Sequence, residues 1–177
     1  IEKVVFKYNG KVIKTSHDHL NGTDRIYEAI EKLGRPDIEL VMNLQGDEPL
    51  MNIEDIQNLN NQMMGPGYQL GTLASKITKK ENFQKDSIVK VITDKSLEIS
   101  KFPLALNFLR KSDGNVNNIY HHLGIYCYNL EILKKFVSLK QSSNEIKNRL
   151  EQLRALDNNI KINVALAKSS PIGVDTK

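Results

Sequence analysis

The chain has 177 residues, 40% hydrophobic and 26% charged, with a net charge of +4 at pH 7 and a single cysteine, Cys127. This composition predicts a soluble domain with a buried core, and the single cysteine excludes an internal disulfide. The sequence contains no apolar run of the roughly 20 residues that a membrane span needs. Its first residues lack the features of a secretory signal. The lysines are spread along the chain and tryptophan is absent, which argues against nucleic-acid binding. Because a single cysteine suits a reducing compartment, we expect a cytoplasmic protein that contacts neither nucleic acid nor membrane.

The first part of the chain predicts strands alternating with helices. A short strand is expected at 11–15, followed by a helix at 23–33 whose apolar residues recur every three to four positions. The apolar run 39–44 lies between turn signals and predicts a strand buried on both faces. Asn52 can cap a further helix that ends near Met63.

The second part continues this alternation. Residues 101–118 show no clean period and are expected to form a mobile connection. The alternation as a whole predicts an α/β fold with a three-layer, mostly parallel, doubly wound sheet, in which ligands bind beyond the carboxyl ends of the strands. The remaining strands are expected at 70–77, 88–93, 120–128 and 160–167, and the remaining helices at about 130–139 and 144–156.

Two aspartates follow predicted strands, one directly after a glycine and the other two residues after one. The segment LQGDEP places Asp47 after the strand 39–44, and GVDT places Asp175 after the final strand. Mg²⁺ is usually held by one or two carboxylates together with phosphate oxygens of the substrate. If the two strand ends meet, Asp47 and Asp175 could share metal ions and bridge a triphosphate. Alternatively, Asp47 belongs to an ordinary turn and Asp175 caps a helix.

The segment HDHLNGTDR contains a His-x-His pair, but no further ligands complete a zinc site. We expect Gly22 and Thr23 to cap the following helix and to present backbone and hydroxyl donors to a ligand. Arg25 is either a partner for a phosphate or carboxylate, or a solvated helix residue.

Two later segments carry polar side chains suited to a polyhydroxylated acid. In YHHLGIY, strand alternation places His122 and Tyr126 on one face, where both could hydrogen-bond a ligand. The alternative is that His122 is structural and Tyr126 half-buried. In LEQLRAL, the leucines form the core stripe of a helix and leave Glu151 and Gln152 off it, free for solvent or ligand.

The segments HDHLNGTDR, VMNLQGDEP, YHHLGIY, RLEQLRALDNNIKINVA and GVDT, in this order, resemble the CMP-Kdo synthetase family, where Kdo is 3-deoxy-manno-octulosonate. The match covers nearly the whole chain, and HHLGIY with LEQLR favours the Kdo enzymes over the sialic acid ones. The resemblance implies a nucleotide-diphospho-sugar transferase fold, a homodimer, and Mg²⁺-dependent transfer of CMP from CTP to Kdo for lipopolysaccharide biosynthesis. A cytidylyltransferase for another acidic sugar, such as sialic acid, and a non-catalytic fragment are the alternatives.

The resemblance also implies roles for individual residues. Asp47 and Asp175 correspond to the catalytic residues that bind magnesium. The residues that hold the sugar acid correspond to Gln45, His122, Tyr126, Glu151 and Gln152. The residues near the cytidine correspond to Asn21, Gly22, Thr23 and Arg25.

Parts of the family pattern have no counterpart in residues 1–177. These are the opening strand, its basic phosphate-binding loop and the helix expected after GVDT, and His121 stands where the family has arginine or lysine. We therefore expect one cytidylyltransferase domain over 1–177, N-terminally truncated. Because the phosphate loop supplies several charge-assisted hydrogen bonds, we expect these residues alone to have little or no turnover.

Overall fold

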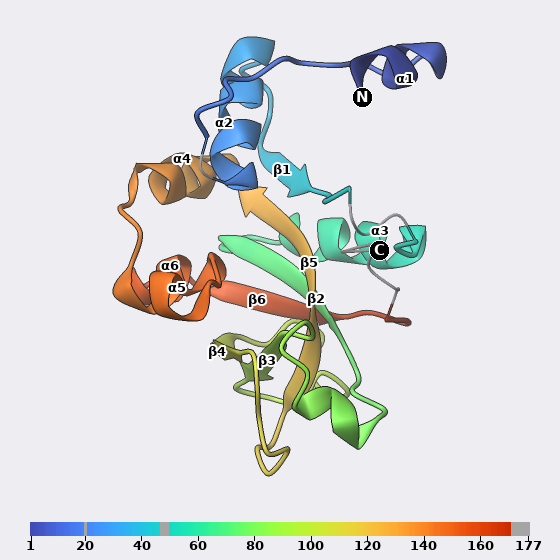
Figure 1. The fold of residues 1–177 in the computed structure, drawn as a ribbon, viewed down its shortest axis with the longest axis vertical. Helices are drawn as coiled ribbons and strands as arrows, with labels where there is room; N and C mark the ends of the chain where they lie inside the picture. Colours follow the sequence, from blue (N-terminus) through green and yellow to red (C-terminus); the bar gives the residue numbers. More distant parts are fainter. Residues whose placement is uncertain (20, 47–49, 171–177) are drawn as a thin grey trace. The chain divides into compact units, whose positions relative to one another are not determined.

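The computed structural model describes residues 1–19, 21–46 and 50–170 (Figure 1). The chain divides into two compact units, Ile1–Ile38 and Glu39–Lys177, and each is described by itself. Among the described residues, no helix combines the length and the apolar character needed to cross a bilayer.

The first unit contains two helices, α1 (Glu2–Lys7) and α2 (Gly22–Leu33). The helix α2 was expected, and it ends as predicted at Gly34, which adopts a left-handed conformation with φ of 60°. The strand expected at 11–15 does not form, and this prediction is wrong. In its place, side chains of α2 bond the backbone of this segment: Lys32 Nζ donates to the Lys14 carbonyl at 2.8 Å.

The second unit is built on a six-stranded sheet in the order β4-β3-β5-β2-β6, with β1 paired to β5. The long strand β5 has β2 along one edge and shares its other edge between β1 and β3. The strands are β1 (Leu40–Asn43), β2 (Leu70–Ser75), β3 (Lys90–Thr93), β4 (Ala105–Leu109), β5 (Ile119–Asn129) and β6 (Ile162–Leu166).

The α/β class is confirmed, but the expected mostly parallel pairing needs correction. Among the described strand pairs only β2–β6 is parallel, because β5 runs against its neighbours β1, β2 and β3, and β4 runs against β3. Between β2 and β5 the chain has a short 3₁₀ helix, η1 (Lys80–Phe83), but none of the α-helices that usually return a chain to a parallel position. The strands β1, β2, β3 and β6 nevertheless all run in one direction.

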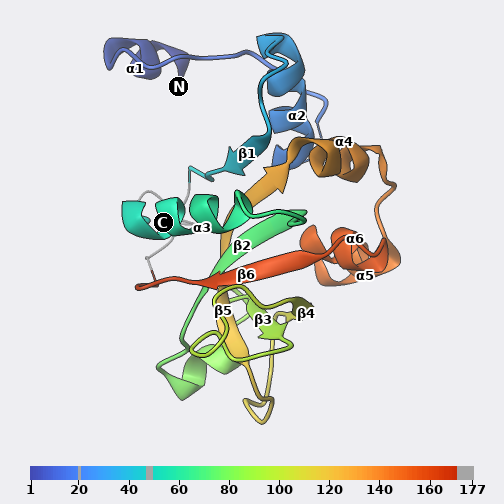
Figure 2. The same ribbon diagram turned by 180° about the vertical axis from the view of Figure 1, so that it is seen from behind.

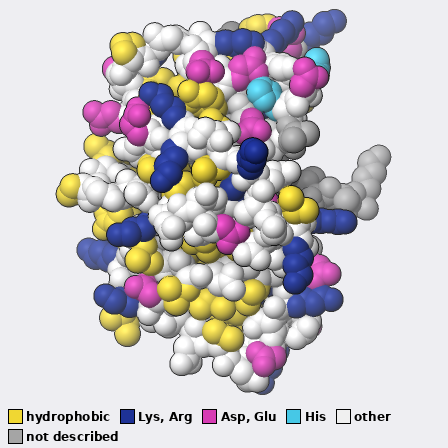
Figure 3. Space-filling view, turned by 90° about the vertical axis from the view of Figure 1, so that its left-hand side faces the viewer, with side chains coloured by type: hydrophobic (Ala, Val, Ile, Leu, Met, Phe, Trp, Pro, Cys, Tyr) yellow, Lys and Arg dark blue, Asp and Glu magenta, His cyan; other side chains and the backbone are white. Residues whose placement is uncertain are grey.

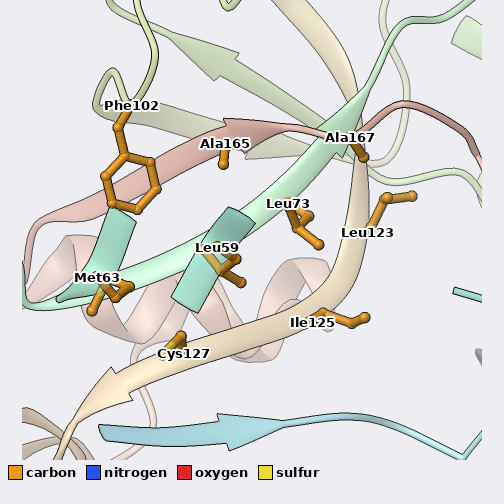
Figure 4. Close-up of a cluster of buried hydrophobic side chains, with 9 residues drawn as sticks. All are labelled: Leu59, Met63, Leu73, Phe102, Leu123, Ile125, Cys127, Ala165 and Ala167. Atoms are coloured by element: carbon orange, nitrogen blue, oxygen red, sulfur yellow. The ribbon is translucent and has the colours of Figure 1, made fainter. Parts of the chain in front are cut away.

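One face of the sheet packs against α3 (Ile53–Met63), which begins as predicted at the cap Asn52. Figure 4 shows the buried cluster between them, in which α3 meets β2, β5 and β6. Cys127 is fully buried here, and burial raises the pKa of its thiol to about 11, which suits a core residue and not a nucleophile. The cluster comprises Leu59, Met63, Leu73, Phe102, Leu123, Ile125, Cys127, Ala165 and Ala167.

The opposite face is covered by α4 (Leu130–Ser138), α5 (Ser143–Asn148) and α6 (Gln152–Asp157). In Figures 1 and 2, α3 lies to one side of the sheet and α5 and α6 lie to the other. Helices α5 and α6 replace the single helix expected at 144–156, because Arg149 adopts a left-handed conformation with φ of 52° and ends α5. The predicted mobile connection at 101–118 is also corrected, because it contains β4.

Candidate active site

Three of the predicted sugar-acid residues meet on one face of β5. His122 and Tyr126 are both buried on this face, and their ring centroids are 5.4 Å apart. Gln45 follows β1, and its side-chain Oε1 lies 3.6 Å from the position of a Cβ added to Gly124. Gly124 stands between the two rings along the strand, so the Gln45 amide covers the strand where it carries no side chain. The structure therefore brings Gln45, His122 and Tyr126 together.

His122 and Tyr126 belong to a row of five aromatic rings on this face. Consecutive ring centroids lie between 5.0 and 6.1 Å apart, and the geometry is edge-on or tilted. Such contacts fix ring orientation beyond what apolar burial alone provides. The row runs from β4 across β5 to α4 and consists of Phe108, His122, Tyr126, Tyr128 and Phe136.

The hydrogen bonds around His122 define its protonation. Burial, with a smaller effect from His121, lowers the pKa of His122 to about 3, so the ring is neutral near pH 7. Thr72 Oγ1 lies 2.9 Å from His122 Nε2 and 2.7 Å from the carbonyl oxygen of Ile125. Because the hydroxyl has one proton and donates it to that carbonyl, the hydrogen-bond network assigns the imidazole proton to Nε2. Nδ1 is then the acceptor of the ring.

Glu151 approaches the same group from the start of α6. Burial, then Tyr128 and Glu151, raise the pKa of Tyr126 well above its ordinary value, so its hydroxyl stays protonated and can donate. The Glu151 side chain is 31% exposed, in keeping with the prediction that it lies off the core. Gln152 is buried, at 6% exposure, so it is not free for solvent, and its role in holding the sugar acid stays a prediction.

Sequence reasoning missed a buried ion pair behind Glu151. Arg154 donates from Nε to Glu145 Oε2 at 2.8 Å and from a terminal nitrogen to Oε1 at 2.5 Å. Both residues are almost fully buried. The sequence signal was the S-x-x-E box of Ser142 and Glu145, which marks a helix start but does not identify the arginine partner.

The predicted nucleotide residues lie in the first unit, at the start of α2. The cap is Asn21, whose Oδ1 accepts the backbone N–H of Asp24 at 2.9 Å, so the expected cap at Gly22 and Thr23 is corrected. An asparagine carbonyl reaches this amide, whereas glycine has no side chain to do so. The Thr23 hydroxyl is buried and has no hydrogen-bond partner among the described residues.

Arg25 is not simply a solvated helix residue, because its side chain bonds the segment before α2, and its expected role toward a phosphate or carboxylate stays a prediction. Its guanidinium donates to Thr15 Oγ1 and to the Ser16 carbonyl, both at 2.7 Å. It therefore fixes the segment that precedes α2, while Gly22 is exposed in the first turn of the helix.

The two predicted metal ligands, Asp47 and Asp175, lie outside the described residues. Within residues 1–19, 21–46 and 50–170, no group of three or more His, Cys, Asp or Glu side chains could hold a metal ion. The strands that precede the two aspartates, β1 and β6, run in the same direction. After β6, buried Asp55 of α3 accepts the backbone N–H of Lys168 at 3.0 and 3.1 Å, which anchors the chain as it leaves the sheet.

The chain is similar to known proteins over most of its length. A family model described as cytidylyltransferase matches residues 1–162. A 3-deoxy-manno-octulosonate cytidylyltransferase of Thermodesulfovibrio yellowstonii is 43% identical, over 97% of this chain and 71% of that protein.

Solved structures agree with this similarity. A CMP:2-keto-3-deoxy-manno-octonic acid synthetase complexed with CTP superimposes with a TM-score of 0.86 and 31% identity, over 99% of this chain and 71% of that one. An apo UDP-glucose pyrophosphorylase, 8% identical, shares the fold alone with a TM-score of 0.63, over 96% of this chain and 60% of that one. The expected nucleotide-diphospho-sugar transferase fold is confirmed. The chain belongs to the cytidylyltransferase family, among the 3-deoxy-manno-octulosonate cytidylyltransferases.

Proposed function

We propose that this protein transfers CMP from CTP to Kdo, giving CMP-Kdo and pyrophosphate for lipopolysaccharide biosynthesis. The observation that carries this proposal is the meeting of Gln45, His122, Tyr126 and Glu151 around one face of β5. The membership of this chain in the cytidylyltransferase family supports the same activity.

The chemistry of these side chains suits a sugar acid. The Tyr126 hydroxyl donates, His122 Nδ1 accepts, and the Gln45 amide does both, while the Glu151 carboxylate accepts from sugar hydroxyls. A site built from fixed donors and acceptors rejects ligands that leave them unpaired. We propose that Gln152, next to Glu151 at the start of α6, completes this set.

The proposed reaction is a nucleotidyl transfer. A hydroxyl oxygen of Kdo forms a bond to the α-phosphorus of CTP, the bond from that phosphorus to the β-phosphate oxygen breaks, and the hydroxyl proton is lost to solvent. Such a transfer depends mainly on alignment and on stabilising charge, so the protein's task is to hold the sugar in line with the phosphorus. The fixed aromatic row and the neutral His122 serve this alignment.

We further propose that Asp47 and Asp175 hold Mg²⁺. The shared direction of β1 and β6 supports a common rim for the segments that follow these strands. Carboxylate oxygens are the donor type that Mg²⁺ prefers, and the bound ion would neutralise charge on the phosphate oxygens.

For the nucleotide we propose the start of α2. Here the buried Thr23 hydroxyl has no partner among the described residues, and the N–H groups of a helix start favour negative charge. Asn21 caps this helix start, Arg25 bonds the segment before it, and Gly22 leaves the first turn open to a ligand.

A labelled-substrate experiment tests the proposed activity. The protein is incubated with α-³²P-labelled CTP and Mg²⁺ and with either Kdo or sialic acid, and ligand-observed NMR measures binding of each sugar separately. We expect Kdo to be bound and to accept the label in preference to sialic acid. Because binding needs no turnover, it tests the site even where catalysis is slow. A protein that neither binds Kdo nor transfers CMP to it, or that prefers sialic acid, contradicts the proposal.

Finally, we propose a cytoplasmic homodimer. Figure 3 shows hydrophobic side chains gathered on the lower part of one face, at the level of β3 and β4. Leu106 of β4 is 59% exposed, and β4 is the last strand at its end of the sheet. Light scattering with size-exclusion chromatography tests this: we expect a dimer that Leu106→Glu weakens, and a monomeric wild-type protein would refute it.

A further inference from the structure

Arg154 contacts three separate parts of the second unit although it is only 2% exposed. Two of its nitrogens bond the Glu145 carboxylate at 2.8 and 2.5 Å. Its guanidinium carbon lies 4.7 Å from the ring centroid of Phe136. A terminal nitrogen also lies 4.0 Å from Glu151 Oε1.

The Glu145 carboxylate is itself fixed on its other sides. It accepts the backbone N–H of Ser142 at 3.1 Å and the side-chain amide of Gln141 at 3.2 Å. Since the arginine fork is planar and both Glu145 oxygens bind it, the plane of the guanidinium has little freedom to rotate. Arg154 is therefore a rigid cation.

The other two contacts of Arg154 lead to the sugar-acid residues by different routes. Phe136 is the last ring of the aromatic row that includes His122 and Tyr126. Glu151 acts on Tyr126 directly through its charge. Buried Arg154 thus packs on Phe136, the last ring of the aromatic row, and also faces the Glu151 carboxylate.

We infer that Arg154 is a positioning residue for sugar-acid binding, which orients the Glu151 carboxylate from behind while Glu145 fixes Arg154. This inference rests on the proposed function. Because Arg154 is buried and its terminal nitrogen lies 4.0 Å from Glu151 Oε1, we assign its effect to that carboxylate and not to a direct contact with the sugar. A site of this kind needs such support, since a binding group that its neighbours do not hold loses its productive geometry.

Substrate-specific binding separates this role from a purely structural one. Loss of a structural ion pair lowers stability and affects both substrates alike. Loss of a positioning residue weakens Kdo binding and leaves CTP binding unchanged. The conservative Arg154→Lys keeps the charge but loses the two-pronged geometry, and Arg154→Met removes both. Arg35→Met is the matched control, since Arg35 is exposed and its guanidinium bonds Asp37.

The experiment is a double-mutant cycle between Arg154 and Glu151, with Kdo and CTP affinities measured by NMR titration and stability by urea unfolding. We expect Arg154→Lys and Arg154→Met to weaken Kdo binding about tenfold or more, with CTP affinity unchanged. In a Glu151→Gln background the same substitutions should add almost nothing. If Arg154→Met does not fold, Arg154→Lys and Glu145→Gln supply the comparison.

Three outcomes overturn the inference: unchanged Kdo affinity in the folded Arg154 variants, equal losses for both substrates, or additive losses in the double mutant. A wild-type protein that binds no Kdo instead refutes the proposed function itself. Wild-type binding with any of these three outcomes refutes only the role of Arg154.

Discussion

The side-chain amide of Gln45 lies directly over Gly124, with its Oε1, Cδ and Nε2 atoms 3.6 to 3.8 Å from where a Cβ would stand. A residue after the first strand of the sheet thereby covers the middle of β5, between His122 and Tyr126. A Cβ at position 124 would meet the amide at ordinary contact distance, so a side chain larger than that of alanine would have to displace it.

Substitution at Gly124 should separate folding from binding. An alanine Cβ makes only ordinary contacts here, so we expect Gly124→Ala to change the KM for Kdo little. The branched Gly124→Val should displace the Gln45 amide and raise that KM about tenfold, while stability changes by about 1 kcal/mol or less, because valine suits a strand. Steady-state kinetics and urea unfolding measure both. Equal effects of alanine and valine would argue against the role of Gln45.

The buried neutral His122 should make stability depend on pH. Its folded pKa of about 3 lies below the ordinary value of 6.5, so between these values the unfolded chain binds a proton that the folded protein does not. Stability is then full above about pH 6.5 and falls as the pH is lowered, by about 2 kcal/mol between pH 7 and pH 5.

Urea unfolding at pH 7, 6 and 5 measures this dependence. His122→Gln should abolish most of the loss of stability between pH 7 and pH 5, which is about 2 kcal/mol. His17→Gln, at an exposed position, should retain that loss. An unchanged slope in His122→Gln would show that the ring takes up a proton in the folded state.

The packing of α3 on β2 leaves no room at Gly71. A Cβ there would lie 2.7 Å from Met63 Sδ and 2.9 Å from Leu59 Cδ1. We expect Gly71→Ala to lower the free energy of unfolding by about 1–3 kcal/mol through overpacking. Because Met63→Ala vacates that space, the double variant should lose less than the sum of the two single losses.

Thermal and urea unfolding check this expectation. Gly22→Ala serves as the control, because an added Cβ there meets nothing within 4 Å. Strict additivity would mean that the Met63 side chain moves aside at no cost.

Magnesium dependence tests Asp47. We expect Asp47→Ala to lower turnover of the active enzyme about a hundredfold or more, the scale of losing one principal electrostatic stabiliser. EDTA should abolish turnover in the wild type and added Mg²⁺ should restore it, whereas the exposed Asp86→Ala should behave as wild type. Near-normal rates in Asp47→Ala would remove this carboxylate from the mechanism.

The sequence was most informative where a single period holds along an element. Strand alternation placed His122 and Tyr126 on one face of β5, and the structure confirms that placement. It failed where local geometry interrupts the period. In β4 two exposed residues, Leu106 and Asn107, stand together between buried ones, so neither alternation nor a helical stripe is visible.

The break between α5 and α6 was equally hidden. Arginine is not a residue type that favours the left-handed conformation, yet Arg149 adopts it. The Glu145–Arg154 pair, which spans this break, joins residues that belong to different helices. Such a pairing between two helices cannot be deduced from one sequence. The roles of Asp47, Asp175 and Gln152 stay predictions.

The arrangement of strands around β5 has a consequence for biosynthesis. Of the described strands, β1, β2 and β3 all pair with β5, which follows every one of them in the chain. As the ribosome releases the polypeptide, β1 and β2 have no strand partner until residues 119–129 emerge, and only the β3–β4 pair can form earlier. Non-local pairing of this kind is slow and leaves strand edges open in the meantime. The nascent chain is therefore exposed to aggregation until β5 has been synthesised, and chaperone binding would be most useful during that interval.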